Sequence, residues 1–387
     1  MAVYKLFPEK DATLYTEFPN ANTGLDQILE ASTYLKNDAA QVSRYLIKFS
    51  TDEIAEIYNN KITNGEYTVY LRNFNAVVTG LNLDKHLDFL PVSGSWAMGT
   101  GRYHNSPKTE NGTSWYWQDY SGSTEWATSG FAEYVTASYS ESIAGGGTWY
   151  TASNLSTLDP VTQSQAFSYA NTKDVLVDVK NTVETWYSYS LDSSNGFANQ
   201  GFLVKQPDSS EFIQNKANTC IFRYFSIDTN TIYPPQLEFR YNDYVFDTGS
   251  STNVVLPQIE SFISIYNNEG TYYSESVPRL RFAAMPKYPD RSFLTASLYS
   301  INYYLPESQS LYALKDTETN EFVIDFDSEY TRISADATSS YFDLHCNGLE
   351  PERYYTVLVQ TKVNGVTKVF DENIMFKVAK GWVTKNK

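Results

Sequence analysis

The first half of the chain alternates apolar and polar side chains with a period of two residues. In the segment QVSRYLIKF, Tyr45, Ile47 and Phe49 share one side, and the residues between them share the other. The segments EYTVYLRNF, TCIFRYFSI and PQLEFRY repeat this alternation. Because successive side chains of a strand point to opposite faces, the pattern predicts antiparallel sheets, each with one face on a core.

Two short helices are predicted between these strands. Ser50 and Glu53 have the spacing of a capping box, which opens the stretch IAEIYNN. In DVLVDVKNTVETWYS, the alternating valines indicate a strand, and Val179, Val183 and Trp186 then follow the i, i+4, i+7 spacing of a helix.

The chain of 387 residues is long enough for two domains. The small polar segment DTGSSTN, residues 247–253, predicts a linker between a domain at 1–246 and a domain at 254–387. In the second domain, alternating residues from Tyr355 to Val363 lead into Asn364-Gly365, the strongest short signal for a hairpin turn. Its size and strands predict an immunoglobulin- or fibronectin-III-like sandwich. The fold class expected for the whole chain is therefore all-β.

The pattern loosens between about residues 93 and 170, where the chain is rich in Gly and Trp. Long loops in a compact domain are usually functional or ordered by a partner, which makes the aromatic residues here candidates for a binding site or interface. Three interpretations stay open: the rings close the core, they form a protein interface, or they stack on sugars. The candidate residues are Trp96, Trp115, Tyr116, Trp117, Tyr120 and Trp126.

Composition narrows the choice of partners. The 32 tyrosines suit both half-buried strands and contact surfaces. The formal net charge of −16, with Lys and Arg scattered singly, argues against nucleic acid as a partner. No apolar stretch is long enough to span a membrane, and the N-terminus MAVYKLFPEKDATLY shows no signal peptide, so we expect synthesis in the cytoplasm and no membrane partner. Cys220 and Cys346 lie in different predicted domains, each within an apolar run, which favours buried free thiols over a disulfide.

No sequence motif points to catalysis. The chain has no GxSxG, HExxH or P-loop motif, and its three histidines, His86, His104 and His345, are far apart. A pair of carboxylates of the glycosidase type stays open, although nothing indicates a particular pair. The turn LDSSNGFANQG has Asp and Asn oxygens that could bind Ca²⁺, but their spacing departs from that of the EF-hand loop. The favoured interpretation is that these residues serve the backbone geometry of the turn. We therefore expect no enzyme activity, no catalytic residue, no metal site and no cofactor.

The order of segments in residues 1–244 resembles the DNRLRE family, whose jelly-roll domain is similar to carbohydrate-binding modules. The stretches that carry the resemblance are DATLY, PNANTGLDQILEAS with its Asn-x-Gly turn, RYLIKF before the first helix, DVLVDVKNTVETW with NQGFLVKQ, and PPQLEFRY. The resemblance implies a jelly-roll sandwich with short helices for the first domain. The chain departs from many members in lacking a signal peptide and in its longer, Trp-rich segment at about 97–170.

A jelly roll that begins at Met1, is followed by an immunoglobulin-like domain and has no export signal resembles virion proteins of large tailed bacteriophages. This resemblance implies a structural or assembly protein in the tail, baseplate, neck or head surface. Its partners would be other virion proteins or copies of itself. The alternative is a carbohydrate-binding adhesin or receptor-binding fibre protein whose partner is a glycan of the host surface.

Overall fold

The computed structural model describes residues 2–37, 39–62, 66–81, 84–126, 145–150, 163–207, 209–211, 219–241, 253–288, 302–306 and 309–381. It confirms the all-β class, with strands throughout and two α-helices within these ranges. The chain forms two compact units. The larger unit contains Leu6–Asn59 and Thr68–Glu238, and the smaller unit contains Met1–Lys5, Asn60–Tyr67 and Phe239–Lys387. The predicted linker at 247–253 lies outside the described residues except for Asn253.

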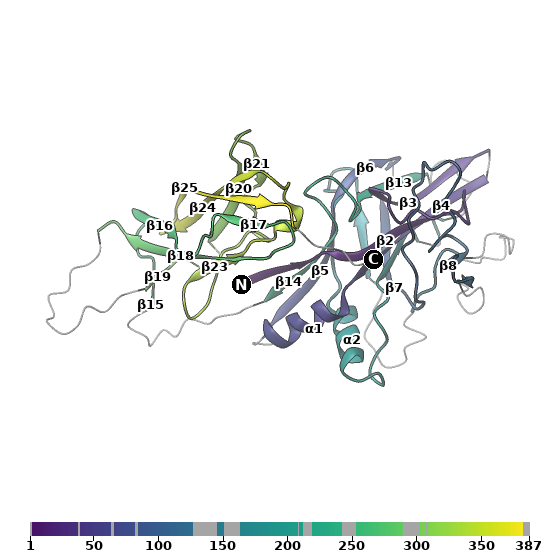
Figure 1. The fold of residues 1–387 in the computed structure, drawn as a ribbon, viewed down its shortest axis with the longest axis horizontal. Coiled ribbons are helices and arrows are strands. Elements are labelled where there is room, and N and C mark those ends of the chain that lie inside the picture. The colour runs from purple at the N-terminus through teal and green to yellow at the C-terminus, as the bar shows by residue number, and fades with distance from the viewer. Residues whose placement is uncertain are drawn as a thin grey trace. The chain divides into compact units, whose positions relative to one another are not determined.

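The larger unit is built on one large sheet with the strand order β10-β7-β12-β4-β3-β13-β6, in which β2 also pairs with β4 (Figure 1). Its strands run antiparallel to their neighbours. They are β2 (Pro8–Tyr15), β3 (Ile28–Lys36), β4 (Ala39–Phe49), β6 (Asn75–Thr79), β7 (Lys85–Pro91), β10 (Gln163–Phe167), β12 (Phe202–Lys205) and β13 (Cys220–Phe225).

Shorter elements complete the larger unit. Strand β5 (Tyr67–Asn73) pairs with β11 (Val175–Asp178), and β8 (Trp117–Asp119) pairs with β9 (Thr124–Glu125). The two predicted helices are confirmed as α1 (Thr51–Asn60) and α2 (Lys180–Leu191). The Ser50 hydroxyl accepts a hydrogen bond from the Glu53 amide, as the capping signal predicts. Strands β1 (Ala2–Leu6) and β14 (Gln236–Tyr241) are divided between the units: residues 2–5 and 239–241 belong to the smaller unit, and Leu6 and residues 236–238 to the larger.

The large sheet is covered on both faces around β4, where the sequence predicted only one buried face. Arg44 and Leu46 are as fully buried as Tyr45 and Ile47. Tryptophans from the Gly- and Trp-rich segment pack with Leu46 and other apolar side chains of β2, β4, β7 and β12 in one hydrophobic cluster. The one-sided prediction for this strand is therefore wrong, because a distant irregular segment supplies the cover for its second face.

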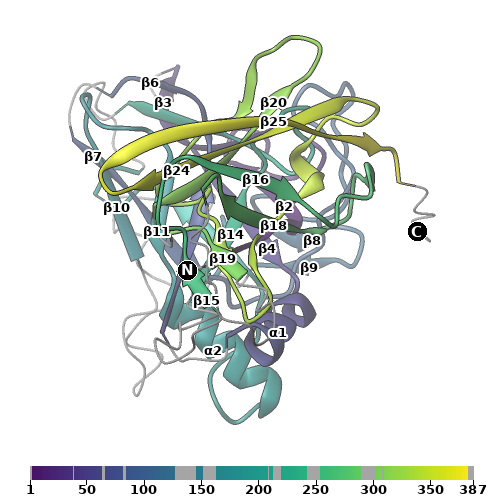
Figure 2. The ribbon, with the colours of Figure 1, turned by 90° about the vertical axis from the view of Figure 1, so that its left-hand side faces the viewer.

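The smaller unit is a two-layer β structure. One sheet has the order β15-β19-β18-β23-β22, with β16 also paired to β18, and the other has the order β17-β25-β24-β20-β21 (Figure 2). The strands are β15 (Asn253–Val255), β16 (Ser261–Ile265), β17 (Thr271–Tyr273), β18 (Arg279–Pro286), β19 (Asn302–Tyr304), β20 (Ser310–Asp316), β21 (Phe322–Ile324), β22 (Ser334–Ala335), β23 (Ser340–Asp343), β24 (Tyr354–Val363) and β25 (Val366–Ala379), with a short 3₁₀ turn at Cys346–Gly348.

A single core joins these two sheets. It contains Phe342 of one sheet and Tyr312 of the other, whose stacked rings have centroids 3.9 Å apart. The predicted hairpin is confirmed: Asn364 and Gly365 both have positive φ, at 51° and 83°, as a type I′ turn requires.

The two cysteines are confirmed as buried free thiols, Cys220 in the larger unit and Cys346 in the smaller. Burial raises the pKa of each to about 11. No helix in the described ranges is long and apolar enough to cross a membrane.

Candidate functional site

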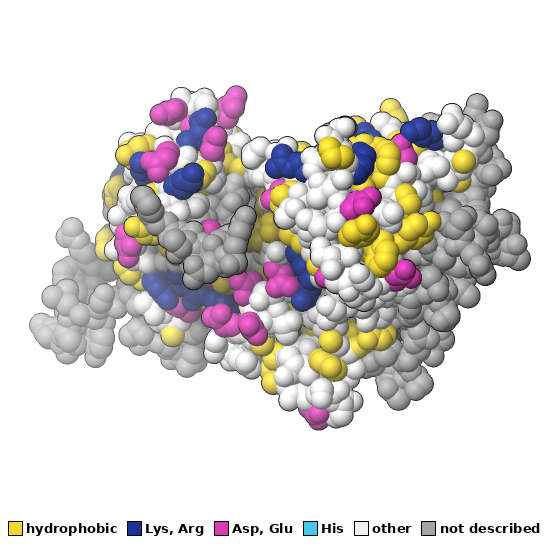
Figure 3. Space-filling view, turned by 45° about the vertical axis from the view of Figure 1, so that its right-hand side comes forward, with side chains coloured by type: hydrophobic (Ala, Val, Ile, Leu, Met, Phe, Trp, Pro, Cys, Tyr) yellow, Lys and Arg dark blue, Asp and Glu magenta, His cyan; other side chains and the backbone are white. Residues whose placement is uncertain are grey.

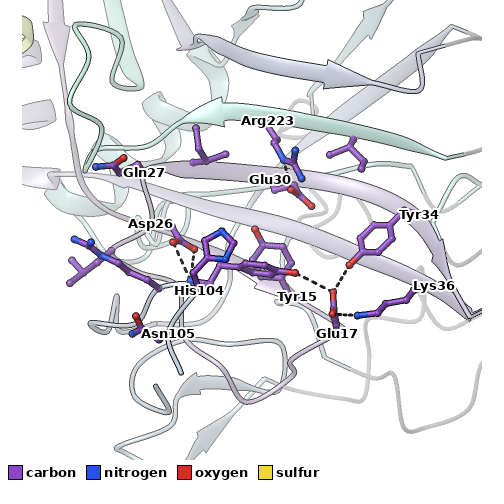
Figure 4. A pocket seen from close by; sticks show the side chains of 15 residues that line it. Tyr15, Glu17, Asp26, Gln27, Glu30, Tyr34, Lys36, His104, Asn105 and Arg223 are labelled. Atoms are coloured by element: carbon purple, nitrogen blue, oxygen red, sulfur yellow. Dashed lines mark hydrogen bonds and ion pairs between the residues drawn. The ribbon is translucent and has the colours of Figure 1, made fainter. Parts of the chain in front are cut away.

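A polar groove with a volume of about 940 Å³ opens on the larger unit, beside strands β3 and β13 (Figure 4). Its lining comes from four separate parts of the chain: the end of β2 and the turn after it, β3 with the turn before it, the loop at 102–105, and β13. The charged and aromatic side chains of the lining include Tyr15, Glu17, Asp26, Glu30, Tyr34, Lys36, Arg102, Tyr103 and Arg223.

The alternation of β3 builds one wall of the groove. Glu30, Tyr34 and Lys36 have even numbers and so share one face of the strand. Arg223 of β13 lies directly opposite Glu30 in the antiparallel register. Its Nε donates to Glu30 Oε2 at 2.7 Å, and this hydrogen bond raises the pKa of Arg223 against the opposing effect of burial.

Glu17 is the centre of the hydrogen-bond network on the other side. Its carboxylate accepts the hydroxyl of Tyr34 at 2.6 Å, the hydroxyl of Tyr103 at 3.2 Å, and the ammonium group of Lys36 (Figure 4). Burial works to raise the pKa of Glu17, but the hydrogen bonds from Lys36 and Tyr34 outweigh it and hold the pKa below its usual value. This ionised carboxylate fixes the tips of two aromatic rings.

Three aromatic rings pack together at the groove, with Tyr15 buried and Tyr103 and Phe18 partly exposed. Tyr15 and Tyr103 have ring centroids 4.8 Å apart, and Phe18 packs edge-on against Tyr103 at 5.7 Å. The backbone amide of Tyr103 donates to both carboxylate oxygens of Asp26, at 3.1 and 3.0 Å. Asp26 nevertheless has a raised pKa, because its desolvation outweighs that hydrogen bond.

The loop that carries Tyr103 is held by Asn22, the first residue of the Asn-x-Gly turn. The buried Asn22 amide donates to the carbonyls of Met98 and Thr113, at 2.7 and 2.8 Å, and accepts from the Gly101 amide at 2.7 Å. A side chain at Gly101 would come within 2.2 Å of the Asn22 carbonyl oxygen, so the close approach requires glycine. The turn thus acts on a loop almost eighty residues further along the chain.

Hydrogen-bond acceptors in the groove are occupied while donors stay available. Glu17, Asp26 and Glu30 all accept hydrogen bonds from the protein. Within the described residues, the Arg223 guanidinium donates only through Nε, and the Arg102 side chain makes neither a hydrogen bond nor an ion pair. The Arg223 side chain is 42% exposed, against 8% for its partner Glu30. The groove therefore combines partly exposed aromatic rings with guanidinium donors that no other described group uses.

The six aromatic candidates from the sequence do not form one site. Trp96, Trp115 and Trp126 are buried in the core cluster, and Tyr116 packs partly buried against it. Trp117 and Tyr120 are only partly buried, and their rings meet edge-on at 5.3 Å. Alternation predicts equal burial for Trp115 and Trp117, and the structure instead starts a new strand at Trp117.

The turn considered as a Ca²⁺ site is held by hydrogen bonds among its own residues. Asp192 accepts hydrogen bonds from the amide and hydroxyl of Ser194 and from the side chain of Asn195. The Asn199 side chain instead donates to the Phe49 carbonyl and accepts from the Gly201 amide. Within the described part of the chain, no three carboxylate, thiol or imidazole groups gather as metal ligands do.

Comparison with known proteins finds no matching family and only weak structural similarity. No family model matches the chain, and no curated protein does, so the likeness to the DNRLRE family stays a prediction. Among solved structures, a DUF4785 family protein from Legionella pneumophila is 9% identical with a TM-score of 0.18, over 97% of this chain and 66% of that one. The adhesin domain of Epf from Streptococcus pyogenes is 9% identical with a TM-score of 0.15, over 98% and 99%. Likenesses this weak carry no argument about function.

Proposed function

We propose that this chain is a non-catalytic carbohydrate-binding protein of the adhesin or receptor-binding class, and that the groove beside β3 and β13 is its binding site. The observation that carries the proposal is the pairing of aromatic rings with unused guanidinium groups in one concave site. Tyrosine rings offer an apolar face to the ring of a sugar, and arginine donates to hydroxyl and carboxylate oxygens.

The ionic pairing inside the groove favours binding over catalysis. Glu17 is paired with Lys36 and Glu30 with Arg223, so both carboxylates act as fixed acceptors that orient donors. A general acid works with a raised pKa, whereas that of Glu17 is lowered. The pKa of Asp26 is raised, but both its carboxylate oxygens accept the Tyr103 amide, so this carboxylate holds the loop in place.

The surface charge favours a glycan over nucleic acid. On the face drawn in Figure 3, Lys and Arg side chains lie singly or in small groups among acidic and apolar ones. A protein of formal charge −16 has little to gain from phosphate contacts.

The test is binding of the fluorescently labelled full chain to a glycan array. The proposal predicts retention of a defined subset of glycans and loss of that subset in Tyr34→Ala and Arg223→Ala. Phe262→Ala, an exposed change in the smaller unit, serves as the matched control. An array on which wild type and Arg223→Ala behave alike contradicts the proposal.

A second function, as a virion structural or assembly protein of a tailed bacteriophage, is favoured by the smaller unit. Phe262 of β16 and Met285 of β18 lie directly opposite each other and are 58% and 59% exposed. Neighbouring apolar side chains exposed to this degree are typical of surfaces that meet another protein. Quantitative mass spectrometry of purified particles tests this function, and absence of the chain from the particles contradicts it.

A further inference from the structure

The surface ring of Trp117 is fixed in place by a hydrogen bond to the turn that also builds the groove. Trp117 is the first residue of β8 and lies opposite Glu125 of β9. Its indole Nε1 donates to Asn20 Oδ1 at 2.9 Å, and Tyr120 packs edge-on against it with an angle of 74° between the rings. A partly exposed indole whose polar atom is already satisfied presents its flat face as an oriented apolar surface.

This ring pair adjoins the groove through the turn after β2. Glu17, the centre of the groove network, and Asn20, the partner of Trp117, are three residues apart in that turn. Consecutive Cα atoms are about 3.8 Å apart, so these two positions lie within about 11 Å of each other.

The residues between the groove and Trp117 include an aromatic and a cationic side chain. The Phe18 ring lies between the two positions in sequence, packs against Tyr103 of the groove, and carries the Lys108 ammonium group 4.1 Å from its centroid. The Tyr116 amide donates to the Pro19 carbonyl at 3.1 Å, which ties the strand start at Trp117 to the same turn. The partly exposed rings therefore continue from Tyr103 through Phe18 toward Trp117.

We propose that Trp117 and Tyr120 form a second stacking subsite for the same ligand, so that the chain binds an extended oligosaccharide and not a single terminal sugar. This inference rests on the proposed carbohydrate-binding function. Units held by Tyr34, Tyr103 and Arg223 would give binding of short glycans. Additional units would reach Trp117 and increase affinity only in longer ones.

The experiment compares dimers with hexamers of β-1,4-linked glucose, N-acetylglucosamine and mannose by titration calorimetry on the full chain. For the series that binds, we expect the hexamer to bind about tenfold more tightly than the dimer in the wild type, the equivalent of one buried contact of moderate strength. Trp117→Ala should remove this gain and leave dimer affinity unchanged. Arg223→Ala should weaken dimer and hexamer by the same factor.

Controls separate a lost subsite from a lost fold. Trp117→Phe keeps a flat ring without the Asn20 hydrogen bond and should retain part of the gain in hexamer affinity. Tyr120→Ala should reduce this gain without altering the melting temperature. Equal dimer and hexamer affinities in the wild type overturn the second subsite while leaving the groove intact. Equal weakening of both ligands by Trp117→Ala also overturns it. Failure of the wild type to bind any of the three series overturns this inference and counts against the proposed function itself.

Discussion

The Tyr34 hydroxyl lies 2.6 Å from Glu17 Oε2, on a carboxylate that also accepts from Tyr103 and Lys36. One charged group thus orients both rings at this side of the groove. A change at Glu17 should therefore alter recognition more than stability.

The substitution Glu17→Gln removes the charge and keeps the shape. We expect glycan affinity to fall several-fold, because Tyr34 and Lys36 lose their common charged acceptor. The free energy of unfolding should change by less than about 1 kcal/mol, as is usual for pairs that reach solvent. Chemical denaturation and calorimetric titration measure the two quantities, and a large loss of stability with unchanged affinity would contradict this role.

The pH dependence of the same site follows from the lowered pKa of Glu17. A carboxylate with a lowered folded pKa stabilises the fold above its ordinary pKa of 4.5, and this contribution is lost as the pH falls through the folded value. Affinity should hold from neutral pH to about 4.5 and decline below it. In Glu17→Gln, the part of this decline that comes from Glu17 should be absent.

Trp115 and Trp117 are two positions apart and should respond to alanine in opposite ways. Trp115 is 1% exposed in the core, so Trp115→Ala should cost about 3–5 kcal/mol of stability. Trp117→Ala should cost about 1 kcal/mol or less, because the ring is partly exposed and surface substitutions cost little. Urea unfolding of the two variants measures both losses of stability. Similar losses would place both rings in the core.

His345 should make the smaller unit sensitive to mild acid. It is buried, accepts a hydrogen bond from the Lys5 amide through Nε2, and has a pKa well below 6.5 because of burial and the nearby Lys5 and Lys61 charges. A histidine with a lowered folded pKa leaves stability unchanged above the unfolded pKa of 6.5, and stability falls as the pH drops below it.

Stability should therefore fall between pH 7 and 5. His345→Gln should flatten that part of the profile of melting temperature against pH. His104→Gln is the control, since His104 is exposed at the groove. A profile that both variants leave unchanged would contradict the assignment.

Asn22→Ala should disturb the groove from a distance. It removes the donors to the Met98 and Thr113 carbonyls and the acceptor of the Gly101 amide, and leaving such buried groups unpaired costs about 1–3 kcal/mol each. We expect lower stability together with reduced affinity, because the loop carries Tyr103. Hydrogen exchange should show faster exchange across the loop, and unaltered exchange there would refute the coupling.

Local signals in the sequence predicted local structure well. Ser50 and Glu53, Asn364-Gly365 and the spacing of Val179, Val183 and Trp186 each involve neighbouring residues, and each has its predicted element. The polar face of β3 is visible in ILEASTYLK, where Glu30, Tyr34 and Lys36 share a parity.

Local signals could not predict the groove. Tyr15, Tyr103 and Arg223 are brought together only by strand pairing and by a loop that Asn22 holds in place. Arg44 illustrates the same limit. Alternation predicts it at an exposed face, whereas it is fully buried with its guanidinium on Glu211 at 2.6 Å and near the ring of Trp115. Only the tertiary structure brings these groups together.

The central claim, that the groove beside β3 and β13 binds carbohydrate, is tested most directly by titrating a glycan retained on the array against wild type and Arg223→Ala. Loss of the available guanidinium should weaken binding about tenfold. Because Arg223→Ala also removes the partner of the buried Glu30, the melting temperature should fall, and the titration is made well below it. Phe262→Ala should bind as the wild type does. Equal affinity in wild type and Arg223→Ala, or an equal loss in Phe262→Ala, would contradict the assignment of the binding site to this groove.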